Sequence, residues 1–251
     1  MGPLYMTTSW DDGDVLDIKL SQLLDRYGVK GTFYVAKQFR ANRLSEDEIR
    51  QLGASHEIGA HTLTHPDLRS LSKGEKFEEI AGSKKWLEEV LNKEVEMFCY
   101  PSGFYDKNDV AIVRNLGFAG ARTAESGRIE PDGNLAEISP TIQVYPFPFR
   151  RINSRQYYWR YLFQPLTQRD PALRRLGVPL INMRSWGSAA KSAFDIARVR
   201  GGVFHLWGHS WEVEKYDMWA ELEELLKYCR SHSDLKALTN GEMVKILHSL
   251  R

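Results

Sequence analysis

The amino-acid sequence predicts an α/β fold of parallel strands covered by helices. Short runs of β-branched and aromatic residues alternate with amphipathic segments over the first 121 residues, and this order is typical of βαβ units. A chain of 251 residues suits one α/β barrel or one doubly wound sheet. Because no repeat, low-complexity segment or linker interrupts the chain, we expect one domain over residues 1–251.

The first half contains strand, helix and stop signals in regular succession. Strands are expected over residues 4–10, 31–36, 56–60, 96–100 and 118–121. Helices are expected over 15–27, from Ser45 to 52, from 71 to 91, and from Asp106 or Asn108 to 117. Ser45 and Glu48 form a capping-box pattern at the start of the second helix. The third helix is expected to turn one apolar face inward: Phe77, Ile80, Ala81, Trp86, Leu87 and Leu91.

The regular alternation stops between about residues 122 and 175. One strand is expected within 141–145, and the rest of this insertion is rich in aromatic residues and arginines without clear periodicity. Order returns in the last third of the chain. There we expect strands over 178–183 and 202–207, and helices over 188–200, 217–228 and 240–250.

The composition excludes several function classes. Lys and Arg total 34 against 33 Asp and Glu, so a net charge of +1 favours neither nucleic acid nor an anionic membrane as partner. Two cysteines, Cys99 and Cys229, do not make a disulfide framework. No apolar run approaches membrane-spanning length, and the first residues lack a signal-peptide pattern, so we expect a cytoplasmic protein.

Two adjacent carboxylates, Asp11 and Asp12, stand where the first strand ends and a loop opens at Gly13. Side chains at such strand ends often carry the chemistry of α/β proteins. Like charges repel, so a shared site needs a cation or a division of roles between the two groups. A turn followed by a helix cap at Asp14 is the simpler interpretation, and the pair alone favours it.

A histidine pair, His61 and His65, favours a cation site over the simpler interpretation of a turn and helix cap. Residues at i and i+4 lie on one face of a helical turn and can hold one cation, although two surface histidines also occur at this spacing by chance. The pair follows a strand, as Asp11 and Asp12 do, and parallel strands bring both to the same edge of a sheet. Two imidazole nitrogens and one carboxylate oxygen make a usual catalytic zinc set.

Three further segments follow strands in the same way. A turn at residues 100–103 can aim a backbone N–H at a developing oxyanion, Arg122 ends another strand, and His209 follows the strand over 202–207. Together with a metal and a spare carboxylate, these groups provide what metal-assisted hydrolysis of an acyl group needs.

At these residues the chain resembles the polysaccharide deacetylase family, the carbohydrate esterases with a NodB-type domain. Ser9-Trp10-Asp11-Asp12-Gly13 is similar to the first family motif, and His61-Thr62-Leu63-Thr64-His65 matches the second in full. Tyr100-Pro101-Ser102-Gly103 resembles the end of the third, and Leu206-Trp207-Gly208-His209 resembles the fifth. The resemblance covers about residues 4–120 well and 202–211 moderately.

The resemblance implies a distorted (β/α) barrel, often of seven strands, and a divalent metal, most often zinc, with cobalt, nickel or manganese as alternatives. It implies that Asp12, His61 and His65 are the metal ligands and that Asp11 is the base. It further implies that the Ser102 N–H stabilises the oxyanion and that His209 protonates the leaving amine. The remaining residues expected around the substrate are Tyr100, Pro101, Gly103, Arg122, Trp207 and Trp211.

The chain departs from the family pattern at three points. The third motif lacks its usual arginine, because Phe98-Cys99-Tyr100 occupies that stretch, and we hypothesise that Arg122 supplies the charge. The fourth motif has no clear counterpart, with Arg184-Ser185-Trp186 at best a distant substitute. His205 competes with His209 as the acid, but its place inside a strand favours a packed core histidine.

The insertion admits two interpretations. Eight aromatic residues lie between 145 and 163, and seven arginines lie between 150 and 175. They suit either a long loop with short helices folded over the barrel, with the aromatics in the core and the arginines in solvent, or a substrate platform. On the second interpretation a phosphate-bearing sugar is a plausible substrate, whereas nucleic acid fits the total charge poorly.

The leading functional hypothesis is therefore a metal-dependent hydrolase of carbon–nitrogen bonds that removes an acetyl group from an amino sugar or sugar conjugate. Two alternatives stay open. One is an amidohydrolase of the same fold acting on a cyclic amide or ureide, and the other is a non-catalytic carbohydrate-binding relative.

Overall fold

A curled sheet of parallel strands forms the centre of the molecule. The computed structural model describes residues 4–130, 133–150 and 159–249. Seven strands follow one another in the order β5-β4-β3-β2-β1-β7-β6, and every pair is parallel. Their bounds are Leu4–Asp12 (β1), Thr32–Val35 (β2), Glu57–Ala60 (β3), Met97–Cys99 (β4), Gly120–Arg122 (β5), Ile142–Gln143 (β6) and Val203–Gly208 (β7). This confirms the distorted (β/α) barrel of seven parallel strands.

An eighth parallel strand, β8 (Leu235–Leu238), was not expected from the sequence. It pairs with the first half of β1, from Leu4 to Thr7, whereas β2 pairs with the second half, from Ser9 to Asp12. On the other edge β7 pairs with β1 from Tyr5 to Trp10, so β1 has a neighbouring strand on both sides over most of its length. Strand β1 is the structural centre of the barrel.

The two edges of the sheet are joined by one irregular segment instead of a further strand pair. The Ile138 N–H donates to Ala121 O beside β5 (2.8 Å). A few residues later the Thr141 N–H donates to His205 O in β7 (2.8 Å). The segment between residues 138 and 144 therefore spans the gap between β5 and β7.

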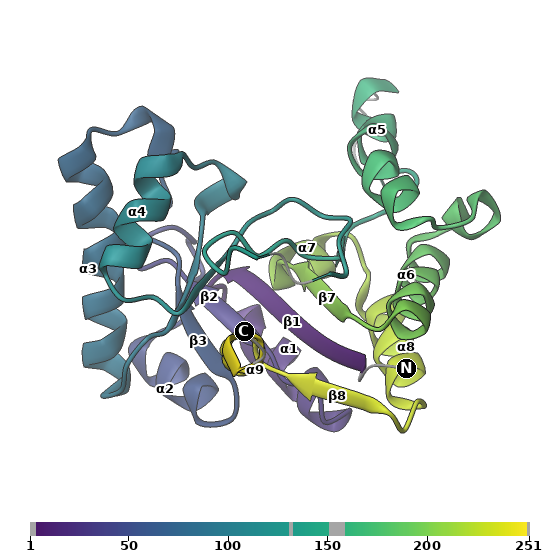
Figure 1. Ribbon diagram of the computed structural model, residues 1–251, viewed down its shortest axis with the longest axis horizontal. Coiled ribbons are helices and arrows are strands. Elements are labelled where there is room, and N and C mark those ends of the chain that lie inside the picture. The colour runs from purple at the N-terminus through teal and green to yellow at the C-terminus, as the bar shows by residue number, and fades with distance from the viewer. Residues whose placement is uncertain (1–3, 131–132, 151–158, 250–251) are drawn as a thin grey trace.

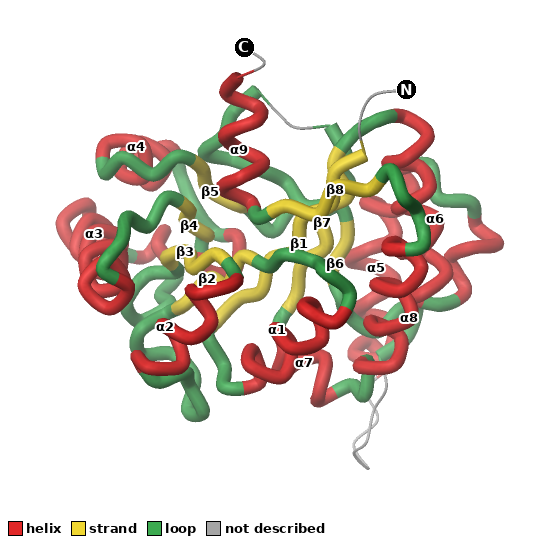
Figure 2. Tube along the Cα trace, turned by 90° about the horizontal axis from the view of Figure 1, so that it is seen from below, coloured by secondary structure: helices red, strands yellow, loops and turns green. Residues whose placement is uncertain are grey.

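Helices surround the curled sheet (Figure 2). Those of the first half are α1 (Leu16–Arg26), α2 (Glu46–Ser55), α3 (Lys73–Leu91) and α4 (Lys107–Asn115), and those of the second half are α5 (Trp159–Leu176), α6 (Trp186–Arg200), α7 (Ser210–Lys215), α8 (Trp219–Arg230) and α9 (Asn240–Ser249). The expected capping box of α2 is present, since Ser45 and Glu48 exchange both hydrogen bonds. Helix α9 lies on the concave side of the sheet, where Val244 belongs to a buried cluster with Tyr34, Met97 and Cys99.

Helix α5 is the largest element that the sequence did not predict (Figure 1). Pro165 and Pro171 lie inside it, and such residues normally interrupt a helical pattern. The helix projects from the body at one corner of the molecule (Figure 1). The insertion therefore contributes one long helix where the sequence indicated a long loop with short helices.

Two local predictions were wrong. The strand expected over 178–183 is a 3₁₀ helix over Leu180–Arg184, and Leu180 and Ile181 lie exposed on the surface with no neighbouring strand. Phe77 is 47% exposed instead of packed inward. The adjacent Lys76 is buried instead, because its Nζ lies 3.1 Å from Asp109 Oδ1 and pairs with Asp106 as well.

Among the described residues, no helix combines the length and the hydropathy that crossing a bilayer requires.

Candidate active site

The residues singled out from the sequence meet at the carboxyl end of the barrel. Asp11 and Asp12 end β1, His61 follows β3, Arg122 ends β5 and His209 follows β7. Because all these strands are parallel, their ends share one edge of the sheet. A pocket of about 240 Å³ opens there, and its walls contain Asp11, Asp12, Phe39, His61, His65, Ser102, Gly103, Arg122, Ala124, Trp207, His209 and Trp211.

Asp12, His61 and His65 form a cluster that could hold a metal ion. Asp12 Oδ1 lies 3.8 Å from His61 Nε2 and 3.6 Å from His65 Nε2. Asp12 is 2% exposed, and its Oδ1 is a buried oxygen without a hydrogen-bond partner among the described residues. An unpaired buried carboxylate oxygen is unfavourable by itself, so this donor set fits a divalent cation at that position.

Neighbouring groups hold the three donors in ligating form. His61 Nδ1 donates to Cys99 O (2.8 Å), which leaves its Nε2 lone pair directed at Asp12. Burial lowers the pKa of His61 to about 4, so the ring is neutral at neutral pH. Burial also lowers the pKa of His65, whose ring stacks on Phe39 with centroids 4.0 Å apart. The second oxygen of Asp12 accepts from Trp211 Nε1 (2.8 Å).

Asp11, the other carboxylate, is paired with Arg122. Arg122 Nη2 donates to Asp11 Oδ1, and both side chains are almost fully buried. Burial would raise the pKa of Asp11, but the charges of Arg122 and His61 overcome it and hold the pKa below its ordinary value. Cys99 lies opposite Arg122 in the β4–β5 register, so the guanidinium comes from the strand next to the one that carries Cys99.

His209 is held by a residue that the sequence analysis missed. Its Nδ1 donates to Glu212 Oε2 (2.6 Å), and its Nε2 lies 4.0 Å from Asp12 Oδ2. Burial lowers the pKa of His209, but the hydrogen bond to Glu212 and the charge of Asp12 raise it to about 9. The only sequence signal for Glu212 is a carboxylate three residues after the histidine.

His205 lies elsewhere. It sits inside β7, is 3% exposed, and its Nε2 lies 2.8 Å from Ser9 Oγ. Burial lowers its pKa to about 3. It does not line the pocket that contains Asp12 and His209, which agrees with the expectation of a packed core histidine.

The turn after β4 divides into two parts. Ser102 and Gly103 line the pocket, and Ser102 has a left-handed backbone (φ 54°). Tyr100 and Pro101 are buried behind it, and the Tyr100 hydroxyl donates to Ala136 O (2.9 Å). The structure therefore brings Ser102 and Gly103 to the site but leaves Tyr100 and Pro101 as support for the turn.

The comparisons with known sequences agree with these motifs. The family model described as polysaccharide deacetylase matches residues 3–121. The Bacillus subtilis (strain 168) protein YxkH, which carries polysaccharide deacetylase in its name, is 27% identical over 117 residues. That match covers 45% of this chain and 42% of YxkH, so the chain spans less than half of that relative's length.

Solved structures share the fold over nearly the whole chain. A Mycobacterium smegmatis structure named as a polysaccharide deacetylase is 15% identical, covers 100% of this chain and 94% of its own, and has a TM-score of 0.67. A family 4 acetyl xylan esterase from Clostridium thermocellum, solved in complex with a cobalt ion, is 17% identical, covers 96% and 91%, and has a TM-score of 0.58. At such identities the likeness shows the barrel fold alone. Together with the family match over residues 3–121, it confirms the resemblance to the polysaccharide deacetylase family seen in the motifs.

Proposed function

We propose that this chain is a metal-dependent hydrolase that removes an N-acetyl group from an amino sugar or sugar conjugate. The observation that carries the proposal is the unpaired Asp12 Oδ1 facing His61 and His65 in one buried pocket. The same pocket contains the Asp11–Arg122 pair and the His209–Glu212 pair. A ligand set, a carboxylate and a histidine are the groups that hydrolysis of an amide requires.

Asp12, His61 and His65 would hold the metal, and the neutral imidazoles with one carboxylate favour zinc, with cobalt, nickel or manganese as alternatives. Cobalt is the ion in the structurally similar acetyl xylan esterase. When bound, the cation supplies Lewis-acid activation of water and of the acyl carbonyl.

Each remaining polar group has a distinct role in this proposal. Asp11 accepts the proton of the attacking water, and Arg122 keeps its carboxylate ionised and oriented. The Ser102 N–H donates to the oxyanion as the carbonyl becomes tetrahedral. His209 gives a proton to the departing sugar nitrogen, while Glu212 fixes its ring. Trp207 and Trp211 supply walls against which a sugar ring can stack.

A substrate screen with two product assays tests the proposal. The protein is stripped with a chelator, reloaded with zinc or cobalt, and incubated with N-acetylated monosaccharides and chitooligosaccharides, with acetate and free amine scored separately. We expect both products in equal amounts, and none from Asp11→Asn or Asp12→Ala. The matched control is Asp47→Asn, since the Asp47 side chain is 94% exposed on α2, and it should act like the parent protein.

Two other outcomes would replace the proposal. Ring opening of hydantoin-like compounds without acetate release would assign the same machinery to cyclic amides or ureides. Saturable sugar binding without any product, unchanged in Asp11→Asn, would indicate a non-catalytic carbohydrate-binding protein.

We also propose that residues 1–251 act as one catalytic domain with the insertion at about 122–175, and that neither nucleic acid nor a membrane is a partner. Limited proteolysis would test the domain proposal by showing whether a shorter fragment resists digestion. The cytoplasmic location expected from the sequence stays a prediction, which cell fractionation would test.

A further inference from the structure

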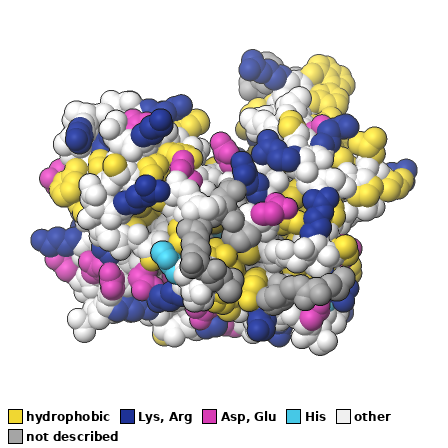
Figure 3. Space-filling view, in the orientation of Figure 1, with side chains coloured by type: hydrophobic (Ala, Val, Ile, Leu, Met, Phe, Trp, Pro, Cys, Tyr) yellow, Lys and Arg dark blue, Asp and Glu magenta, His cyan; other side chains and the backbone are white. Residues whose placement is uncertain are grey.

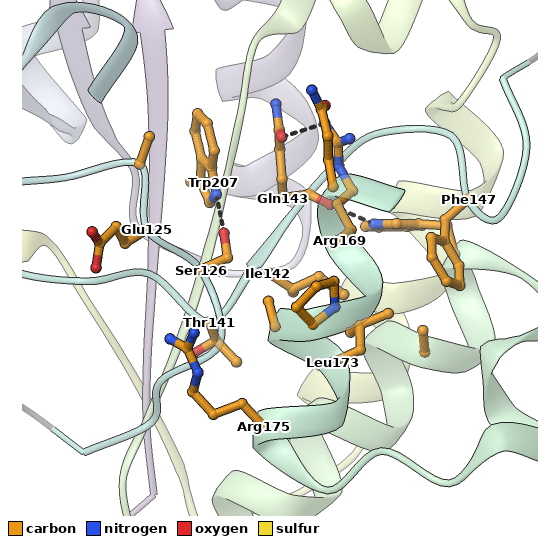
Figure 4. Close-up of a pocket in the computed structure, with 16 residues that line it drawn as sticks. Glu125, Ser126, Thr141, Ile142, Gln143, Phe147, Arg169, Leu173, Arg175 and Trp207 are labelled. Carbon is orange, nitrogen blue, oxygen red and sulfur yellow. Dashed lines mark hydrogen bonds between the residues drawn. The ribbon is translucent and has the colours of Figure 1, made fainter. Parts of the chain in front are cut away.

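A second cavity lies beside the candidate active site. It has a volume of about 470 Å³, which is within the usual range for small-molecule sites. Ala124 and Trp207 line both this cavity and the pocket that contains Asp12. In Figure 4 the Trp207 indole stands at one side of the cavity, where its Nε1 donates to Ser126 Oγ (3.0 Å). One extended ligand could therefore contact both spaces across Trp207.

The walls of this cavity come from the part of the chain beyond the family match. They include the strand β6, with Ile142 and Gln143, and side chains from helices α5 and α6. The family model ends at residue 121, so none of these walls belongs to the matched segment. The insertion thus builds a compartment next to chemistry that the first half provides.

Two arginines of α5, Arg169 and Arg175, line the cavity, and within the described residues neither forms an ion pair with an acid. The charge of Glu212 acts on Arg169 only across Gln143, which contacts both side chains. Arg169 Nη2 donates to the neutral Gln143 Oε1 (2.6 Å), and its guanidinium lies over the Tyr145 ring at 4.0 Å. Its Nε and Nη1 are buried atoms that have no hydrogen-bond partner among the residues the structure describes. Within the described part of the chain, Arg175 makes no ion pair or hydrogen bond, and Figure 4 shows its guanidinium beside Thr141.

The acid in the lining does not neutralise these charges. Glu125 also lines the cavity, but its carboxylate points away from Arg169 and Arg175 (Figure 4). A buried guanidinium without a counter-charge is unfavourable by several kcal/mol in general, and a bound anion relieves that penalty. Lys and Arg side chains also gather on the surface around the base of α5, with an acidic side chain among them (Figure 3). The charge of the cavity therefore favours an anion.

We propose that this cavity binds an anionic group, a phosphate or a carboxylate, on the carbohydrate whose acetyl group enters the catalytic pocket. A planar guanidinium recognises both groups through paired N–H donors. Apolar side chains such as Phe147, Trp186 and Leu173 in the same walls suit the less polar faces of a sugar. The proposal rests on the deacetylase function for the position of the acetyl group, whereas anion binding itself can be measured without turnover.

Isothermal titration calorimetry with three matched sugars tests the proposal. The probes are N-acetylglucosamine, N-acetylglucosamine 1-phosphate and N-acetylmuramic acid, which are neutral, phosphate-bearing and carboxylate-bearing. We expect one or both anionic sugars to bind at least about tenfold more tightly than the neutral sugar, with a preference that weakens at high salt. The anionic sugar that binds more tightly shows whether the cavity prefers a phosphate or a carboxylate.

Three substitutions of arginines in α5 provide a matched comparison of cavity-lining and surface positions. Arg175→Gln and Arg169→Gln should each reduce the preference to less than about threefold while neutral-sugar binding stays unchanged. Arg174→Gln is the control, because Arg174 Nε pairs with Asp170 Oδ2 (2.6 Å) and does not line the cavity, so it should keep the full preference. Thermal melts establish that each variant is folded. Should Arg169→Gln unfold, the exposed Arg175 decides the question alone.

Equal affinity of the parent protein for neutral and anionic sugars would overturn the proposal, as would a preference that survives in Arg175→Gln. Failure of the two proposals can be told apart. Anion preference without acetate release would leave the cavity proposal standing and refute the deacetylase. Acetate release without a preference for anionic sugars would support the deacetylase proposal and refute the cavity proposal.

Discussion

Two regions of the molecule, residues 4–122 and residues 123–202, each contain an arginine whose guanidinium is buried wholly or in part. The two arginines differ in whether a carboxylate neutralises their charge. In the first region the buried arginine, Arg122, is neutralised by Asp11, and the pair is fixed between the ends of two strands. In the second region, among the described residues, Arg169 donates to Gln143 and lies over an aromatic ring, and the charge of Glu212 acts on it only across Gln143. A buried ion pair is complete before any ligand arrives, whereas an unpaired buried cation gains a partner only on binding. Under the two proposals above, the first region contributes the metal ligands and the base, and the second contributes selection among substrates.

The largest expected effect comes from removing a proposed metal ligand in the first region. Asp12→Ala deletes the oxygen that faces both histidines, so acetate release should fall at least about a thousandfold. Metal content measured by mass spectrometry after dialysis should fall with it. Arg175→Gln in the second region should leave both quantities unchanged with a neutral substrate. Loss of turnover in Arg175→Gln with a neutral sugar would contradict the division between the regions.

Arg122→Ala should have the next largest effect. Deacetylation should fall about a hundredfold or more because the Asp11 carboxylate loses its orienting partner, while metal content stays the same. The protein should also lose about 3–5 kcal/mol of unfolding free energy, since a buried charge is left unpaired. The double variant Asp11→Asn, Arg122→Ala should recover stability but no activity, as judged by urea unfolding and acetate release. If Arg122→Ala alone had the same unfolding free energy as the parent protein, the pair would not be buried as described.

These two regions also differ in how well the sequence predicts them. Parallel strand ends and short helices with capping signals, such as Ser45 with Glu48, are local patterns, and the structure follows them closely. The Asp12, His61 and His65 cluster could be anticipated because Asp12 ends one strand, His61 directly follows another, and His65 comes four residues after His61. The contact between Arg122 and Asp11 depends on strand order, which the sequence supplied only as a hypothesis. That order places β5 beside β4, so Arg122 faces the position of Cys99.

The second region follows no comparable local rule. Helix α5 contains Pro165 and Pro171, which normally interrupt a helical pattern, so its apolar residues such as Leu166 and Leu173 were not assigned to a helix. The run over 178–183 is apolar like a strand, but no sheet edge is available to it and it forms a 3₁₀ helix. Tertiary packing decides both outcomes. The same is true of the His209–Glu212 bond, which depends on side-chain conformations.

One added methyl group at Gly127 should destabilise the packing of the second region, whereas the first region should stay intact. Gly127 has φ +101°, and a Cβ there would lie 2.9 Å from both Cα and O of Ala172 on α5. Gly127→Ala should therefore cost about 1–3 kcal/mol of unfolding free energy and weaken the anion preference. Gly187→Ala is the control, since nothing lies within 4 Å of its Cβ, and it should be neutral or slightly stabilising. Urea unfolding together with calorimetry measures both effects, and an unchanged Gly127→Ala protein would refute the close approach of α5.

The smallest expected effect concerns Glu212, which lies in α7 outside both regions and contacts His209 as well as Gln143 of the second region. Its Oε2 accepts from His209 Nδ1 and lies 3.4 Å from Gln143 Nε2, whose Oε1 accepts from Arg169. Glu212→Gln should lower kcat about tenfold while KM and metal content stay constant, because a positioning residue acts on the ring that donates the proton. Glu214→Gln is the matched control on the same helix, since Glu214 pairs with Lys19 at the surface (2.9 Å).

Glu212→Gln could also change the KM for anionic sugars while the KM for neutral sugars stays the same. Such a result would mean that the chain of contacts from His209 through Glu212 and Gln143 to Arg169 couples the two cavities. If kcat and KM were both unchanged, Glu212 would have no positioning role, and the imidazole of His209 would be oriented by the surrounding packing alone. The two regions would then be independent, with Trp207 and Ala124 as their only shared walls among the described residues.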